Sequence, residues 1–576
     1  MPATPELSDR ARRLALENAL SHGGPPRPGP ILSRLLADDP SLRSRSGEIG
    51  RLVAEVVAAV AALSPDAQRA ALESLGGPTP ARAATAPARG VLPPLEGADA
   101  GPVVLRMAPF PSGALHVGNG RMIFVNDYYR TLYHGTLLLV IDDTVGSEEK
   151  RVDPEMFEGI RRDLERCEVE VDATYYKSDR VPRFYPWAER VIDAGSAYVC
   201  VCPAATLREN RQSGTACPER AQTVGETRDA WARMLSGGFG AGEAVLRLRT
   251  DLADPDPAFR DRVLFRISDL DHPRVGRRYR VWPLLEFSWA VDDIELGITH
   301  VLRGKDLVIE DRMEEAIWRI LGLSGPRFVH WGLLRVREAK IAKSKAYAEV
   351  KSGVYDGWAD PRSWSIASLD RRGITMEALR RFTLSFGLSL ADIEVPAETL
   401  YAENRAIIDP ITPRRAFVEE PVRLRIDGYP DDLGHVELAN HPDQPALGRR
   451  RVAAGPEVFL AGADVRRLAG EEVRLKELVN VRLPAPDPTA AGGPISATFT
   501  SRENRRLPRL QWVGAPGAVA VDLLGLDGEH RPGLGEAALR DAAPGDRLQF
   551  ERVGFVRVET DWVRGAAPVR VCFGHP

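Results

Sequence analysis

The chain has 576 residues, of which 44% are hydrophobic and 27% are charged. These values exclude a disordered chain and a short disulfide-stapled secreted module, and the length corresponds to roughly four folding units of ~150 residues. The 77 basic and 81 acidic side chains leave a net charge of −4. The net charge therefore gives no sign of a nucleic-acid partner, but it is an average that still allows a local basic face.

The numbers of lysines, arginines and cysteines narrow the class of protein further. The chain has only eight lysines against 69 arginines, so each lysine is informative. Five cysteines without a pairing pattern indicate a reducing compartment. The beginning of the chain has no apolar signal core, and its most apolar run, 52–63, contains Glu55 and is shorter than the ~18 residues of a membrane span. We therefore expect a soluble, cytoplasmic protein with no membrane partner.

Residues 1–75 predict a helical appendage. A first helix can be capped by Ser8 or Asp9, a second stretch covers 47–63, and Ser64 with the following proline opens a third. The next segment, 76–101, is rich in Pro, Ala and Gly and has no helical period. We interpret it as a linker, or as a strap that lies over the following domain.

Residues 102–330 alternate between strand and helix patterns. Buried strands are expected at 103–107, 136–141, 198–201, from Val281 and at 297–302, and helices at 118–133, after Asp153 and after Ser178. This order is typical of a parallel α/β sheet with right-handed crossovers. Residues from about 203 to 280 break the rhythm and predict an inserted subdomain.

The remaining chain changes period twice. Residues 331–405 include a lysine-rich loop and, after Lys345, helical spacing, which predicts a helical connector. From 406 to 576 the period becomes two, as where Leu424 and Ile426 alternate with arginines. Short strands with Gly/Pro turns continue to the end, so this region is expected to be all-β, in one or two barrels.

The first candidate functional cluster is a turn, rich in proline and glycine, between a predicted strand and a predicted helix. It consists of Pro109, Phe110, Pro111, Ser112, Gly113, Ala114, Leu115, His116, Val117, Gly118 and Asn119. Ligands of parallel sheets bind at the carboxyl ends of strands, against helix N-termini. There His116 and Asn119 offer neutral donors to a nucleotide. On these residues alone, a turn with a satisfied histidine remains the alternative.

The second cluster is the run Lys340-Ile-Ala-Lys343-Ser344-Lys345, which holds three of the eight lysines. A solvated charge run would tolerate arginine in this arginine-rich chain. Lysine differs as a compact, mobile point charge, which suits a loop that closes over phosphates. We therefore favour a functional role for this loop.

Together the two clusters resemble the nucleotide-binding motifs of class I aminoacyl-tRNA synthetases. His116-Val117-Gly118-Asn119 is similar to the HIGH motif, and Lys340-Ile341-Ala342-Lys343-Ser344 is similar to KMSKS. Nearly end to end, the chain resembles glutamyl-tRNA synthetases of the archaeal/eukaryotic type, with supporting stretches at 297–305, 357–362, 400–405 and 549–557. The resemblance implies a multidomain α/β protein. Its parts would be a Rossmann-like catalytic domain with an inserted acceptor-binding subdomain, a helical connector and anticodon-binding β-barrels.

The resemblance also implies the reaction and its partners. With ATP and Mg²⁺, L-glutamate would form glutamyl-adenylate and then be transferred to the 3′-terminal adenosine of tRNA(Glu), with tRNA(Gln) as a second candidate acceptor. Two alternatives remain: a diverged paralogue that charges tRNA with another amino acid or for a biosynthetic pathway, and a non-catalytic tRNA-binding homologue. The N-terminal helical unit is a candidate docking module for translation factors.

The resemblance implies a binding role for each residue of this chain that stands at a matching motif position. The residues expected to bind ATP are His116, Gly118, Asn119, Lys340, Lys343 and Ser344. For glutamate, Arg106 is expected to pair with a carboxylate, Asp142 to bind the α-amino group, and Arg303 to bind the side-chain carboxylate. A structural ion pair is the alternative for Arg303.

Several positions depart from the family pattern. Phe110, Val140 and Ala342 replace more usual residues, and Leu285 occupies the place of a substrate-contacting tyrosine, which removes a hydroxyl donor. Related enzymes carry a zinc knuckle at the place where this chain has Cys200, Cys202, Cys217 and Glu219, so the resemblance implies a zinc site at these residues. Three unligated thiols are the alternative to a zinc site.

Overall fold

The structure is a computed structural model that describes residues 5–22, 24–38, 46–75, 77, 90–145, 151–339, 343–485, 494–563 and 567–576. It divides into two compact units, Met1–Arg89 and Gly90–Pro576. In the described part of the chain, no helix combines the length and the apolar character needed to cross a membrane.

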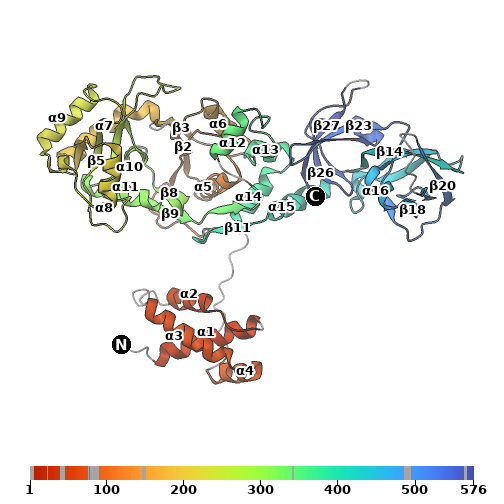
Figure 1. Cartoon of the computed structure of the whole chain (residues 1–576), viewed down its shortest axis with the longest axis horizontal. Helices are drawn as coiled ribbons and strands as arrows, with labels where there is room; N and C mark the ends of the chain where they lie inside the picture. The colour runs from red at the N-terminus through yellow and green to blue at the C-terminus, as the bar shows by residue number, and fades with distance from the viewer. Residues whose placement is uncertain are drawn as a thin grey trace. The chain divides into compact units, whose positions relative to one another are not determined.

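The first unit is helical (Figure 1, red). Its helices bury one apolar core that includes Leu14, Leu16 and Leu35. The Ser64 hydroxyl caps the last helix by accepting from the Ala67 amide at 3.3 Å, as the sequence predicts. A helix beginning at Pro28 escaped prediction because its first turn reads Pro-Gly-Pro, which is typical of a turn. The helices are α1 (Pro5–His22), α2 (Pro28–Asp38), α3 (Ser46–Ala61) and α4 (Pro65–Ser74).

Within the second unit, residues 90–101 form a strap, whereas residues 76 and 78–89 of the predicted linker segment lie outside the described residues. The Tyr129 hydroxyl donates to the Pro93 carbonyl at 2.6 Å, and the Leu95 amide donates to the Tyr133 hydroxyl at 2.8 Å. Since both tyrosines belong to α5 (Gly120–Tyr133), one helix fixes the strap at successive points.

A five-stranded, all-parallel sheet forms the centre of the region that follows the strap, in the order β3-β2-β1-β8-β9. Its strands are β1 (Val104–Met107), β2 (Thr136–Ile141), β3 (Ala173–Tyr176), β8 (His300–Gly304) and β9 (Arg327–Trp331). The associated helices are α5, α6 (Glu155–Arg166), α7 (Lys177–Asp193), α10 (Leu285–Glu295) and α11 (Val308–Leu321), with 3-10 turns at η2 (Val117–Asn119) and η4 (Lys305–Leu307). The expected parallel α/β architecture is confirmed.

Two strands expected in this sheet lie elsewhere. Those predicted at 198–201 and from Val281 pair in a separate antiparallel sheet, β4-β5-β6-β7, so the inserted subdomain extends over both. The parallel sheet instead uses β3, which the sequence analysis missed because its half-buried residues run into α7 without a breaker. The insertion contains β4 (Ala197–Cys200), α8 (Ala204–Ser213), η3 (Pro218–Ala221), α9 (Val224–Leu235), β5 (Val245–Leu248), β6 (Val263–Ile267) and β7 (Val281–Pro283).

A mostly helical connector follows. Its elements are β10 (Leu334–Val336), α12 (Lys343–Lys351), α13 (Ile366–Arg371), α14 (Met376–Leu384), β11 (Ile393–Val395), α15 (Glu398–Ile408) and η5 (Asp409–Ile411). In it, α14 packs on α5, and Phe382 and Leu400 join the core of the parallel sheet.

The C-terminal region is all-β, as expected, and is built on two seven-stranded sheets (Figure 1, blue). The chain starts the first sheet, leaves it to build the second, and then returns. The first contains β12 (Arg414–Arg415), β13 (Phe417–Glu419), β23 (Val519–Leu524), β24 (His530–Gly535), β25 (Arg547–Phe550), β26 (Gly554–Val558) and β27 (Val569–His575). The second contains β14 (Pro421–Asp427), β17 (Glu457–Ala461), β18 (Glu472–Leu475), β19 (Asn480–Arg482), β20 (Ile495–Ser501), β21 (Arg509–Leu510) and β22 (Val513–Gly514). The other elements are β15 (His435–Ala439), η6 (Pro445–Leu447), β16 (Arg449–Ala453), α16 (Gly462–Arg467) and η7 (Ala537–Asp541).

Candidate active site at the carboxyl ends of the parallel strands

Each strand of the parallel sheet contributes a polar side chain at or just after its carboxyl end. These side chains are Arg106 on β1, Asp142 after β2, Lys177 after β3, Arg303 on β8 and His330 on β9. Parallel strands place these ends at one edge, which is where ligands of such sheets bind.

The first motif shapes the entrance of α5. The imidazole Nδ1 of His116 accepts from the Gly118 amide at 3.0 Å, and the Asn119 side-chain oxygen accepts from the His116 amide at 3.1 Å. These reciprocal bonds cap the 3-10 turn η2. Because Nδ1 is an acceptor, the neutral ring carries its proton on Nε2, which makes Nε2 its hydrogen-bond donor.

Residues distant in sequence brace this loop. The Val117 amide donates to the Trp364 carbonyl at 3.1 Å. The Leu115 amide donates at 3.2 Å to the carboxylate of Asp163, and burial raises the pKa of Asp163 to about 6. A Cβ at Gly113 would meet the Trp358 ring at 2.8 Å, so the close approach of that ring requires glycine.

Of the lysine loop, Lys340 lies outside the described residues, as do the side chains of Lys343, Ser344 and Lys345, although the backbone of these three begins α12. The rest of α12 is tied to the first motif. Lys351 Nζ lies 3.5 Å from an Asp153 carboxylate oxygen, and the Asp153 amide donates to the Pro111 carbonyl at 2.8 Å. The end of α12 therefore lies beside the first motif.

Arg106 and Arg303 are both buried and both held by acids. Arg106 makes a bidentate pair with Asp293, Nε–Oδ1 2.5 Å and Nη2–Oδ2 2.8 Å. Arg303 donates from Nε to Asp311 at 2.8 Å and from Nη2 to Glu314 at 2.8 Å. Its remaining nitrogen, Nη1, is buried and has no hydrogen-bond partner among the described residues. Arg303 thus makes the structural ion pair and keeps one donor group without a partner among the described residues.

Glu314 is fully buried, and burial raises its pKa to about 8, an effect to which the nearby Asp293 adds and which Arg303 opposes. The raised pKa favours the protonated form of Glu314, which lowers the negative charge that this residue places beside Arg303. His330 Nε2 lies 2.7 Å from the same Asp311.

The indole of Trp289, on α10, lies among three cations. The Arg106 and Arg303 Cζ atoms are 4.8 and 4.9 Å from its ring centroid, and the Lys177 Nζ is 5.2 Å from it. Lys177 is fully buried, which lowers its pKa, and it donates to the Ser288 hydroxyl at 2.5 Å. An electron-rich ring stabilises neighbouring cations without adding a charge that would repel an anionic ligand.

The two acids after β2 have different surroundings. Asp143 accepts from the Ser178 amide at 2.8 Å and from its hydroxyl at 2.7 Å, so it anchors the beginning of α7. Asp142 accepts from the Thr144 hydroxyl at 3.1 Å and lies 3.9 Å from Lys177 Nζ. Asp142 is therefore the acid that faces the cation cluster.

Sequence reasoning missed Lys177, Trp289 and Glu314. Lys177 had a usable signal, since it is one of only eight lysines and follows an aromatic run at the end of a strand. Trp289 and Glu314 had none, because each lies on a helix whose partners are far away in sequence.

The predicted metal ligands lie together in part. The sulfur atoms of Cys200, Cys202 and Cys217 lie within 4.8 Å of one another, and a Glu219 oxygen lies 3.7 Å from the Cys202 sulfur. The Arg247 guanidinium donates to the Cys217 sulfur at 3.0 Å. Burial opposes ionisation of Cys217, but hydrogen bonds, led by that from Asn210, and the Arg247 charge lower the pKa of this thiol. Three thiol ligands with a carboxylate nearby fit the donor chemistry of a structural zinc site.

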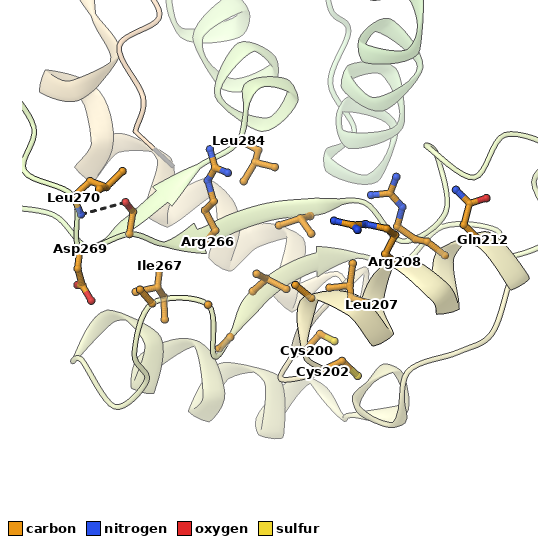
Figure 2. A pocket seen from close by; sticks show the side chains of 18 residues that line it. Cys200, Cys202, Leu207, Arg208, Gln212, Arg266, Ile267, Asp269, Leu270 and Leu284 are labelled. Atoms are coloured by element: carbon orange, nitrogen blue, oxygen red, sulfur yellow. Dashed lines mark hydrogen bonds between the residues drawn. The ribbon is translucent and has the colours of Figure 1, made fainter. Parts of the chain in front are cut away.

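A cavity of about 850 Å³ lies beside these thiols on one face of the inserted sheet (Figure 2). Its wall is mostly apolar, with Leu207 and Leu284 among the lining residues. Arg208 and Gln212 of α8 lie at one end, Asp269 lies at the other, and Arg266 lies between them. Burial lowers the pKa of Arg266, and its Nε is buried with no partner in the described part of the chain. A half-buried guanidinium with one donor unpaired among the described residues, beside an apolar wall, suits an anionic ligand.

Comparison with known proteins gives matches over almost the whole chain. The tRNA synthetases class I (E and Q) catalytic domain matches residues 102–409, and two anticodon-binding domains of the same family match 412–499 and 509–559. The chain is 39% identical to a glutamate–tRNA ligase of Methanopyrus kandleri over 99% of both chains, and 37% identical to one of Pyrococcus abyssi over 96% and 97%. A glutamate-tRNA synthetase structure from Elizabethkingia anophelis aligns over 54% of this chain and 72% of its own, with 18% identity and a TM-score of 0.39.

Proposed function

The chain belongs to the class I tRNA synthetases for glutamate and glutamine, and from this membership we propose how it attaches L-glutamate to tRNA. It is a glutamate–tRNA ligase. The observation that carries this function is the near full-length match to relatives of that name, which covers both the catalytic and the anticodon-binding regions. The relatives from Methanopyrus kandleri and Pyrococcus abyssi are both named glutamate–tRNA ligase, so we propose glutamate, and not another amino acid, as the substrate.

In the proposed mechanism, MgATP lies against the turn before α5, with the Nε2–H of His116 donating to a phosphate. Gly118 and Asn119 line the same turn, while Lys340, Lys343 and Ser344 close over the phosphates and stabilise charge on the leaving pyrophosphate. Glutamate is held by Arg303 at its side chain, by Asp142 at its amino group and by Arg106 at a carboxylate. Its α-carboxylate then attacks the α-phosphate, pyrophosphate leaves, and the 3′-terminal adenosine hydroxyl of tRNA displaces AMP.

Aminoacylation with ATP, Mg²⁺ and tRNA(Glu), supplied with glutamate, glutamine or aspartate in turn, tests this function. Charging with glutamate alone is expected. Charging with glutamine alone would contradict the role of Arg303. A parallel assay with purified tRNA(Gln) determines whether that tRNA is a second acceptor. Cytoplasmic localisation and docking of translation factors on the N-terminal helices stay predictions.

The protonated state of Glu314 predicts how glutamate binding depends on pH. As the pH rises through about 8, Glu314 loses its proton and becomes a second anion beside Arg303. We expect the KM for glutamate to rise about 3- to 10-fold above that pH. In E314Q this rise should disappear, while the KM for ATP should follow the same pH profile in both proteins. If the KM for glutamate rises above about pH 8 in E314Q as much as in the unmodified protein, the prediction is contradicted.

The cavity in the inserted subdomain is proposed to contact the acceptor end of tRNA, with Arg266 as a phosphate contact. R266Q should weaken tRNA binding and reduce the slope of log affinity against log salt by about one. R280Q is the matched control, because Arg280 is more exposed and is already paired with Asp269 at 2.6 Å. Equal salt slopes for R266Q and the unmodified protein would contradict this contact.

A structural zinc ion is proposed at Cys200, Cys202 and Cys217, with Glu219 as the fourth ligand. Protein purified without chelator is expected to contain about one zinc per chain by atomic absorption. C217S should lose the ion and unfold at a lower temperature. The control C167S removes a buried thiol from the main core and should keep the zinc. Absence of zinc from the unmodified protein would favour the alternative of unligated thiols.

A further inference from the structure

The start of α10 lacks a donor that the family pattern provides. Leu285 occupies the position of a substrate-contacting tyrosine, and it is half-buried at the first position of the helix. Residue 289 follows one turn later, so the two side chains project from the same face of α10.

The residue at that second position carries a buried donor without a partner. Trp289 is 4% exposed, and its indole Nε1 finds no hydrogen-bond acceptor among the described residues. By contrast, the Trp318 indole, buried on the neighbouring helix, donates to the Ala290 carbonyl at 2.8 Å. Buried N–H groups without partners are uncommon and costly, and a ligand absent from the structure is one physical reason for them.

The surroundings of Trp289 define the ligand. The indole is flanked by Arg106, Lys177 and Arg303, and the Nη1 of Arg303 is a second buried donor without a partner. The unpaired indole of Trp231, by comparison, lies among aromatic rings of the insertion core. Two unpaired donors in a cluster of cations suit a carboxylate, which accepts through both oxygens.

We propose that Trp289 is a specificity-determining residue whose indole N–H donates to the side-chain carboxylate of bound glutamate, replacing the hydroxyl that Leu285 cannot supply. This inference rests on the proposed role of Arg303 in binding that carboxylate. It explains how the chain tolerates leucine at position 285 and still selects glutamate.

Steady-state charging by W289F tests the inference. Phenylalanine keeps an aromatic ring among the cations but removes the N–H. We expect the KM for glutamate to rise about 10- to 100-fold, with kcat and the KM for ATP little changed. In L285Y/W289F the tyrosine hydroxyl should recover most of this loss. If W289F raised the KM only because the indole ring is lost, the tyrosine at position 285 would not lower the KM again, since it restores a donor and not the indole.

The control is W318F, which removes a buried indole N–H already paired with backbone. It should lower the melting temperature at least as much as W289F and leave the KM for glutamate unchanged. An unchanged KM in W289F, or a raised KM that L285Y fails to lower in a folded double variant, would overturn the inference. Failure of the unmodified protein to charge tRNA with glutamate would instead overturn the proposed function.

Discussion

Replacing Arg303 with glutamine is expected to reduce kcat/KM for glutamate by about 100- to 1,000-fold, mostly through KM. The change removes the one charged group proposed to pair with the side-chain carboxylate. It also leaves Asp311 and Glu314 without their cation, in a buried cluster where unpaired charges are costly. Burial raises the pKa of Glu314 to about 8, so part of this cost is relieved when Glu314 takes up a proton.

Two controls separate substrate binding from stability in this experiment. R372Q removes another buried arginine, which donates to the Tyr401 hydroxyl at 2.7 Å and to the Gly574 carbonyl at 3.0 Å, away from the cluster. It should lower the melting temperature and leave the KM for glutamate unchanged. R303K keeps the charge but loses the planar fork, so an intermediate KM is expected. If R303Q charges glutamate with an unchanged KM, Arg303 has only its structural role.

Replacing Lys343 with alanine is expected to lower the rate of glutamyl transfer about 100- to 1,000-fold in single-turnover charging, with a smaller change in the KM for ATP. The amine is proposed to stabilise charge that develops on the phosphates during the first step, so its loss affects the transition state more than the bound substrate. K343R should recover only part of the rate, since a planar guanidinium does not reproduce a compact ammonium.

The adjacent K345A variant is the matched control for Lys343. It removes the same charge from the same helix, two residues further along the chain, and we expect it to lose less than ten-fold. The assay must contain tRNA, because tRNA is the acceptor whose charging is measured. Equal rates for K343A and the unmodified protein would contradict the proposed closure of the lysine loop.

The elements that the sequence predicted well have strong local signals. The strand Thr136–Ile141 is a continuous apolar run that ends at an acidic pair, and its predicted bounds are those of the structure. The Ser64-Pro65 pair begins a helix because a hydroxyl caps the first turn and proline tolerates that position. Such interactions join residues a few positions apart, so one sequence is enough to recognise them.

Predictions that needed a distant partner were less exact. The run at 198–201 has the same apolar character in either kind of sheet, and only pairing with β5 assigns it to the insertion. The partners of Arg303 could not be predicted either, because the sequence does not distinguish an arginine that binds a ligand from one that makes a structural ion pair.

The sequence by itself indicated the family, through its resemblance to class I synthetases over nearly the whole chain, and the comparisons confirm it. The roles of the two motifs and of Arg303 stay predictions that this resemblance implies. The tertiary structure alone decided which charges meet. Arg106 and Asp293 are 187 residues apart in sequence, yet they make a bidentate buried pair, and Trp289 lies among cations from three different strand ends. Burial then sets the protonation of Glu314 and leaves the Trp289 N–H unpaired, and neither property exists before the helices pack on the sheet.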